Sequence, residues 1–208
     1  KVQNKLYNWS DDKYVEELHT IIQKYKNENV FQDVMHIYQE IVSTYEQKGK
    51  YFKTIPYMKE NAEWTTMIMG PGMGVFMEMQ IMMVQTALGK NKEAEKILNE
   101  IGEKIKFPPF SGMYPMIQSC YYSEIKDWKN FNNIIDIAIE SIQQMGMGMM
   151  VGYIESMKGE YFEDIGEYEK AIHFYKKGLE GGMLGPGIST GIYMQIGRVY
   201  SKLKEYDK

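Results

Sequence analysis

One stretch of the sequence, residues 159–179 (GEYFEDIGEYEKAIHFYKKGL), has the pattern of two short helices joined by a tight turn. Apolar residues recur at helical spacing on both sides of Gly166, as expected of helices that each bury one stripe. Gly166 permits the turn, because glycine adopts backbone angles that other residues avoid, and the small side chain of Ala171 lets the two helices approach. Two helices this short cannot bury their own apolar faces, so the pattern predicts further copies stacked beside them.

The same phase recurs along most of the chain. If Gly159 is taken as the marker of one copy, successive markers follow at steps of 40, 37, 40 and 38 residues. The markers are Val42, Met82, Ser119, Gly159 and Gly197. The turn positions are Gly49, Gly89, Lys126, Gly166 and Lys204. The positions equivalent to Ala171 are Thr54, Ala94 and Phe131. A pattern that recurs at this spacing indicates an array of stacked repeats.

Within residues 159–179, a small residue, an aromatic, a turn glycine, a tyrosine and an alanine fall at the offsets of the tetratricopeptide repeat, which this stretch resembles. These residues are Gly159, Phe162, Gly166, Tyr168 and Ala171. The resemblance extends in phase over residues 30–208, and residues 89–94 are its other specific part. The usual period of that family is 34 residues, so we expect longer helices or longer connections here.

The resemblance implies an all-α chain in which antiparallel helix pairs stack into a right-handed superhelix of about five irregular repeats. We expect residues 1–208 to form a single domain of this kind. Because the chain starts at Lys1 and stops inside a repeat, we also expect a fragment truncated at both ends. The expected helices cover residues 11–26, 30–48, 51–63, 74–88, 91–105, 113–125, 128–144, 150–164, 167–180 and 188–203. Runs such as MIMGPGMG and MGMGMM are expected to be loops or helix starts, because glycine and proline disfavour helix interiors.

The overall composition argues against several classes of function. The formal net charge is -4, whereas a nucleic-acid-binding surface needs a basic face. The most apolar window, residues 67–84, is interrupted by Gly70, Pro71 and Glu78, which argues against a membrane span. Cys120 is the only cysteine, so no internal disulfide can form. No secretory signal opens the sequence, and we expect a cytoplasmic protein.

The residue types that carry catalysis are sparse and scattered. The three histidines, His19, His36 and His173, fall on separate expected helices, and repeats contact only their neighbours. Cys120 has no histidine placed to activate it as a nucleophile. A single cysteine does not supply a zinc site. We therefore expect no enzymatic activity, no cofactor and no bound metal.

Methionine is the unusual residue of this sequence, with 18 copies. Several of them follow M-x-M and M-x-x-M spacings, namely Met67, Met69, Met77, Met79, Met82 and Met83. Thioethers are soft ligands that suit Cu(I), so a methionine-rich copper carrier is one alternative function. On a packed helix, however, methionine usually fills gaps in the core. Another alternative is that the Met/Gly runs belong to an engineered repeat protein.

The resemblance also predicts a binding surface, because in tetratricopeptide arrays the first helix of each pair lines the concave face. Positions three and six residues before each marker, and one and four residues after it, should face the ligand. The residues expected to form this peptide-binding groove are Gln39, Phe76, Met79, Met83, Met113, Met116, Tyr153, Glu160, Met194 and Arg198. A methionine-lined groove can adapt to varied apolar side chains. The alternative is that Met79 and Met83 are core residues.

The expected function is therefore a non-catalytic scaffold that binds a peptide or protein segment in this groove. The loose period and the aromatic-rich helices are also weakly similar to the repeat domains of Gram-positive peptide-pheromone receptors. That similarity implies a signalling role, in which the chain is the ligand-binding domain of a peptide-sensing regulator.

Overall fold

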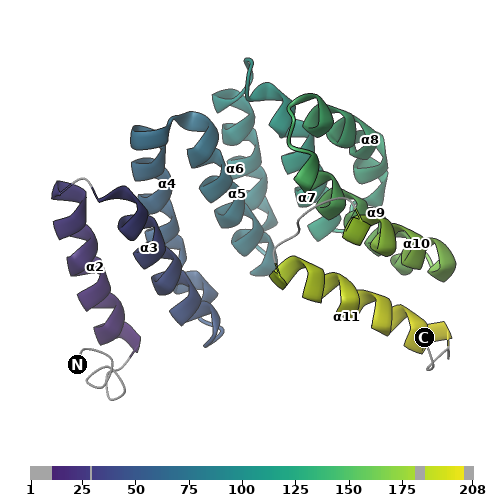
Figure 1. The fold of residues 1–208 in the computed structure, drawn as a ribbon, viewed down its shortest axis with the longest axis horizontal. Helices are drawn as coiled ribbons and strands as arrows, with labels where there is room; N and C mark the ends of the chain where they lie inside the picture. Colours follow the sequence, from purple (N-terminus) through teal and green to yellow (C-terminus); the bar gives the residue numbers. More distant parts are fainter. Residues whose placement is uncertain (1–10, 29, 181–185, 204–208) are drawn as a thin grey trace. The chain divides into compact units, whose positions relative to one another are not determined.

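The computed structural model describes residues 11–28, 30–180 and 186–203. Over these residues the chain is α-helical and has no β-strand, as the sequence predicts (Figure 1). The α-helices are α2 (Asp11–Asn27), α3 (Phe31–Glu46), α4 (Ile55–Met69), α5 (Pro71–Ala87), α6 (Asn91–Lys104), α7 (Tyr114–Glu124), α8 (Trp128–Gln144), α9 (Val151–Asp164), α10 (Tyr168–Glu180) and α11 (Pro186–Leu203). None of these described helices has the length and apolar character needed to cross a membrane.

The chain divides into two compact units, residues 1–97 (unit 1) and residues 98–208 (unit 2), and the boundary falls inside α6. Unit 1 contains α2 to α5, and unit 2 contains α7 to α11. A single repeat domain over residues 1–208 stays a prediction, as does the handedness of the stack.

The turns inside the predicted helix pairs share one backbone geometry. Gly49, Gly89, Lys126 and Gly166 have positive φ angles of 66°, 72°, 56° and 80°. After each of them, the next backbone N–H donates to the carbonyl five residues earlier, which closes the end of the first helix. These four turns lie where the repeat pattern places them. The fifth predicted turn, Lys204, lies outside the described residues.

The position equivalent to Ala171 is buried in every described repeat that contains it. Thr54, Ala94, Phe131 and Ala171 all have 0% exposure. The side chain at this position ranges in size from alanine to phenylalanine, so the packing around it differs from repeat to repeat. The common burial confirms the predicted register of the helix pairs.

One core cluster of unit 1 is shared by α2, α3 and α4. Its buried members are Val15, Ile22, Val34, Tyr38, Ile41, Tyr45 and Trp64. Beside this core, Glu60 of α4 accepts a hydrogen bond from Lys26 Nζ at 2.9 Å and lies 2.7 Å from His19 Nε2, both on α2. Partial burial alone would raise the pKa of Glu60, but the hydrogen bonds from Lys26 and His19 outweigh it and lower the pKa to about 2. An ion pair therefore links α2 to α4.

The Met- and Gly-rich run between α4 and α5 was expected to be a loop or a helix start. It is helical on both sides of one connecting residue, so it contains the start of α5 and a shorter loop than expected. α4 continues to Met69, Gly70 makes the connection with a φ of 88°, and α5 begins at Pro71. Gly74 on α5 allows the two helices to approach, because a β-carbon at this position would collide with the side chain of Thr66. The packing that a missing side chain permits thus offsets the intrinsic cost of glycine in a helix.

In unit 2, α9 and α10 lie side by side (Figure 1). They pack closely through glycines on both helices. A β-carbon built on Gly159 would lie 2.5 Å from Cδ1 of Tyr175, and one built on Gly178 would lie 2.8 Å from the carbonyl oxygen of Gly152. α11 packs against α10 and also contacts α9. The buried residues that these two helices share are Ala171, Ile172, Tyr175, Ile192, Ile196 and Val199.

Candidate functional site

The predicted groove residues of unit 1 lie at the surface to different extents. Gln39 on α3 is exposed, whereas Phe76, Met79 and Met83 on α5 are half-buried. Half burial leaves part of each α5 side chain open to a ligand and packs the rest against the protein. It fits both the groove and the core interpretation of the two methionines.

The predicted groove residues around α7 are core residues in the structure. Met113 and Met116 are 2% and 0% exposed, so they present no surface to a ligand, although the groove prediction places them there. The reason is that α7 is flanked by both α8 and α9, which leave little of its surface open. Cys120 on the same helix is also buried. Burial raises the pKa of its thiol to about 12, which keeps the thiol protonated at neutral pH.

The remaining predicted groove residues of unit 2 stay accessible on α9 and α11. Tyr153 and Glu160 on α9 are half-buried and lie about two helical turns apart on one face. Met194 on α11 is 71% exposed, and Arg198 lies one turn further along the same helix and is also exposed. Because α9 and α11 contact each other, these side chains belong to one region of unit 2.

Glu160 connects the first helices of three successive repeats. Its Oε2 accepts a hydrogen bond from Ser123 Oγ of α7 at 3.3 Å, and its Oε1 accepts one from Gln195 Nε2 of α11 at 2.5 Å. Burial raises the pKa of Glu160, and the hydrogen bonds from Gln195 and Ser123 only partly offset that effect. We use the name α9–α11 face for Tyr153, Glu160, Met194 and Gln195.

Gln195 is the member of this face that the sequence does not predict. It lies two residues before the marker Gly197, whereas the expected offset is three, which is the position of Met194. A polar side chain next to an expected ligand-facing residue was the only signal in the sequence for it.

Arg198 of α11 is exposed, but its guanidinium is already engaged. Its Nε and a terminal nitrogen donate to the two carboxylate oxygens of Glu163 at 2.7 Å each. Lys202 Nζ donates to the same carboxylate at 2.8 Å, and the Tyr175 hydroxyl donates at 2.9 Å. Burial alone would raise the pKa of Glu163, but these hydrogen bonds outweigh it and lower the pKa to about 2. The cluster ties α9, α10 and α11 together.

The methionines of the copper alternative lie in different environments. Met67 and Met69, in the last turn of α4, are 72% and 50% exposed, whereas Met82 of α5 is fully buried. Met77 accepts a hydrogen bond at its sulfur from Asn61 Nδ2 at 3.3 Å. Residues two positions apart on a helix point to nearly opposite sides, so Met67 and Met69 do not share a face. A copper site stays a prediction.

Histidine, cysteine and carboxylate side chains give no sign of a metal centre. Over residues 11–28, 30–180 and 186–203, no group of three or more His, Cys, Asp or Glu is placed to hold an ion. His19 contacts Glu60, His36 is exposed on α3, and His173 meets the ring of Phe174 edge-on at a centroid distance of 5.2 Å.

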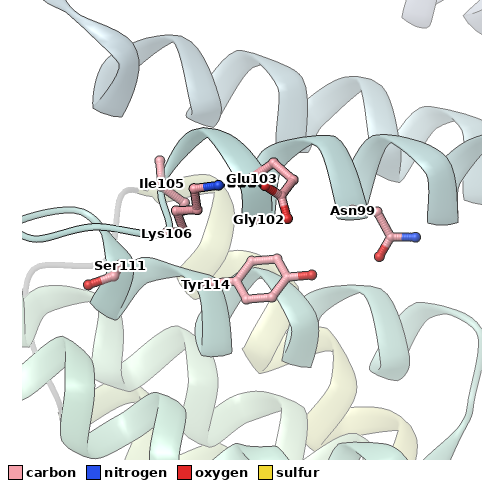
Figure 2. A pocket seen from close by; sticks show the side chains of 7 residues that line it. All are labelled: Asn99, Gly102, Glu103, Ile105, Lys106, Ser111 and Tyr114. Carbon is pink, nitrogen blue, oxygen red and sulfur yellow. Dashed lines mark hydrogen bonds and ion pairs between the residues drawn. The ribbon is translucent and has the colours of Figure 1, made fainter.

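A cavity of about 520 Å³ lies in unit 2 beside the end of α6 and the start of α7 (Figure 2). The ring of Tyr114 fills the space beside Gly102, where a β-carbon would lie 2.7 Å from its Cζ. Lys106 Nζ pairs with Glu103 at 2.9 Å, as the dashed line in Figure 2 marks. The lining residues are Asn99, Gly102, Glu103, Ile105, Lys106, Ser111 and Tyr114. With no histidine or cysteine in this lining, the cavity offers no imidazole-activated nucleophile.

A second cavity, of about 470 Å³, lies in unit 1 between α2 and the start of α4. Its walls include Asp12, which pairs with Lys53 at 2.7 Å and accepts a hydrogen bond from the Tyr45 hydroxyl at 3.0 Å. Asp12 and Lys53 of this wall therefore neutralise each other. Phe52, 60% exposed, forms part of its rim.

Comparison with known proteins gives a family match for one of the repeats. The model of the tetratricopeptide repeat family matches residues 156–180, which cover most of α9 and all of α10. No curated protein matches the chain in sequence. Among solved structures, the chain is similar to the crystal structure of BtubC (BKLC) from P. vanneervenii, with a TM-score of 0.62 and 9% identity. The alignment covers 96% of this chain and 86% of that chain. At this identity the likeness shows the fold alone, and it agrees with the helical repeats predicted from the sequence.

Proposed function

We propose that this tetratricopeptide-like helical-repeat protein is a non-catalytic scaffold that binds a peptide or protein segment on the α9–α11 face. Repeats of this type generally serve protein interactions. The finer proposal is that the bound segment is a short peptide and that the chain is the ligand-binding domain of a cytoplasmic peptide-sensing regulator. The loose repeat period and the aromatic-rich helices support that finer reading.

The observation that carries the proposal is the exposed side chain of Met194 next to a cluster of hydrogen-bonding groups. Met194 is 71% exposed, and its neighbour Gln195 donates to Glu160. An apolar side chain of a peptide would remove the flexible thioether of Met194 from water, and methionine adapts to many shapes. The polar groups beside it would fix the orientation of the bound segment, because specificity in such sites comes from a few placed polar groups.

The test is selection of binding peptides from a random display library against the full chain, followed by affinity measurement by fluorescence anisotropy. Met194→Ala should lower the affinity of the chain for the selected peptides by about five- to tenfold, as expected for truncation of an apolar contact at the centre of an interface. Ile137→Ala is the matched control, because Ile137 is a large apolar side chain, 50% exposed, on the second helix α8. Its removal should leave the affinity unchanged.

Two results would contradict the proposal. One is the absence of any selected peptide that binds the folded chain. The other is an affinity that falls with Ile137→Ala and not with Met194→Ala, which would place binding on the second helices.

A further inference from the structure

Helix α9 carries three glutamates that are buried or half-buried, and two of them are paired with cations. Glu155, 4% exposed, pairs with Lys177 of α10 at 2.6 Å. Glu163, 5% exposed, pairs with Arg198 and Lys202 of α11. Buried carboxylates require such partners, because the cost of removing a charge from water is large unless an opposite charge or several hydrogen bonds compensate it.

The third glutamate, Glu160, has only neutral hydrogen-bond partners in the described part of the chain. These are the hydroxyl of Ser123 and the side-chain amide of Gln195. The nearby guanidinium of Arg198 is held by Glu163 in a two-point ion pair. The charge of Glu124 raises the pKa of Glu160 further, and the charge of Arg198 lowers it by less. Glu160 is therefore a partly desolvated carboxylate whose two hydrogen bonds do not supply a countercharge.

The surroundings of Glu160 suit the two parts of a long basic side chain. Lysine and arginine have an apolar stem and a charged head, and they often bury the stem along apolar groups. On the α9–α11 face, Tyr153 and Met194 offer apolar surface, and Glu160 with Gln195 offers oxygen atoms for the charged head. A buried ion pair formed across an interface contributes strongly to selectivity, because a neutral or acidic residue leaves the carboxylate uncompensated.

We propose that Glu160 binds the cationic head of a lysine or arginine in the segment that docks on the α9–α11 face, and so selects basic peptides. This inference rests on the proposed function and adds the chemical class of the ligand. It also gives Glu160 a cationic partner from the ligand, whereas the cationic partners of Glu155 and Glu163 lie on neighbouring helices of the chain.

The test uses the full chain and four pools of nonapeptides, acetylated at the N-terminus and amidated at the C-terminus. The central residue is lysine, arginine, norleucine or glutamate, and the other positions are varied among uncharged residues. We expect the lysine and arginine pools to bind at least about tenfold more tightly than the norleucine pool. Glu160→Gln should abolish this preference, and Glu160→Lys should transfer it to the glutamate pool. Glu169→Gln is the matched control, since it removes one negative charge from an exposed position on α10 and should keep the preference.

The outcomes separate the two proposals. If the norleucine pool binds in a Met194-dependent way but the basic pools have no advantage, the proposed function stands and the inference about Glu160 is overturned. If no pool binds, both are overturned. The unfolding midpoint of Glu160→Gln should be equal to or above that of the unmodified chain, because the substitution removes an uncompensated charge. A lowered midpoint would show that the chain itself compensates the charge, which contradicts the inference.

Discussion

The ring of Tyr175 occupies the space in which a side chain at Gly159 would lie. A β-carbon built on Gly159 would be 2.5 Å from Cδ1 and 2.6 Å from Cε1 of that ring, and the ring is fully buried between α9 and α10. The same repeat position on α11 is Gly197, where a β-carbon would have no other atom within 4 Å. One glycine is therefore required for packing, and its counterpart is not.

Gly159→Ala should destabilise the chain by about 1–3 kcal/mol, because the added methyl group forces either the helices or the Tyr175 ring to move. Gly197→Ala, at the equivalent position, should stabilise it by up to about 1 kcal/mol, since alanine is the better helix former. Chemical denaturation followed by circular dichroism measures both values. Equal free energies of unfolding for the two alanine variants would contradict the close packing of Gly159 on α9 against Tyr175 on α10.

The turn at Lys126 should be improved by glycine. Lys126 has a φ of 56° where the other three described turns have glycine, and a side chain in this left-handed region costs about 1 kcal/mol or more. Lys126→Gly should therefore raise the free energy of unfolding by up to about 1 kcal/mol. The gain is limited because the substitution also removes the exposed ion pair between Lys126 and Asp164 and frees the unfolded backbone.

The reciprocal substitution, Gly166→Lys, should cost about 1 kcal/mol at a turn with a φ of 80°. Thermal unfolding midpoints of the two variants should move in opposite directions. Equal and negative shifts for both would show that the two turns are not equivalent.

The carboxylate of Glu163 should give part of the acid sensitivity of the fold. Its pKa is about 2 in the folded chain and near 4.5 without the fold. A group whose pKa is lowered on folding stabilises the protein fully above the unfolded value and loses that contribution as the pH falls through the folded value. The free energy of unfolding should thus fall between pH 4.5 and pH 2, and Glu163→Gln should show a smaller fall across this window.

Glu169→Gln again serves as the control for the pH series. Because Glu169 is exposed, this substitution should leave the pH dependence of the free energy of unfolding unchanged. At neutral pH, Glu163→Gln should itself be destabilising, since Arg198 and Lys202 would lose their shared carboxylate. If the free energy of unfolding depended on pH in the same way for Glu163→Gln and the unmodified chain, the ion pairs of Glu163 would not cause the acid sensitivity.

The repeat register could be predicted from the sequence because it depends on local chemistry. Turn glycines at positions 49, 89 and 166 mark positive φ angles directly, and Lys126 follows from the period alone. Burial of Thr54, Ala94, Phe131 and Ala171 follows from helical periodicity. The α4–α5 connection was expected to be longer than it is, because the helix propensity of glycine does not include the close packing of Gly74 against Thr66 that compensates it.

The groove was harder to predict because offsets from a marker fix the side of a helix but not what covers that side. Met113 and Met116 have the expected offsets and are nevertheless buried, since both α8 and α9 pack on α7. Arg198 has the expected offset as well, yet its charge is neutralised by Glu163. Ion pairs between helices depend on distances in space, and the spacing of residues along one sequence does not give those distances.

The most direct test of binding on the α9–α11 face is hydrogen exchange of the full chain with and without the tightest peptide from the display selection. Exchange should slow in α9 (residues 151–164) and α11 (residues 186–203), because the proposed ligand contacts both helices. The second helices α8 (residues 128–144) and α10 (residues 168–180) should be affected less. Slower exchange confined to α8 and α10, with α9 and α11 unchanged, would contradict the account.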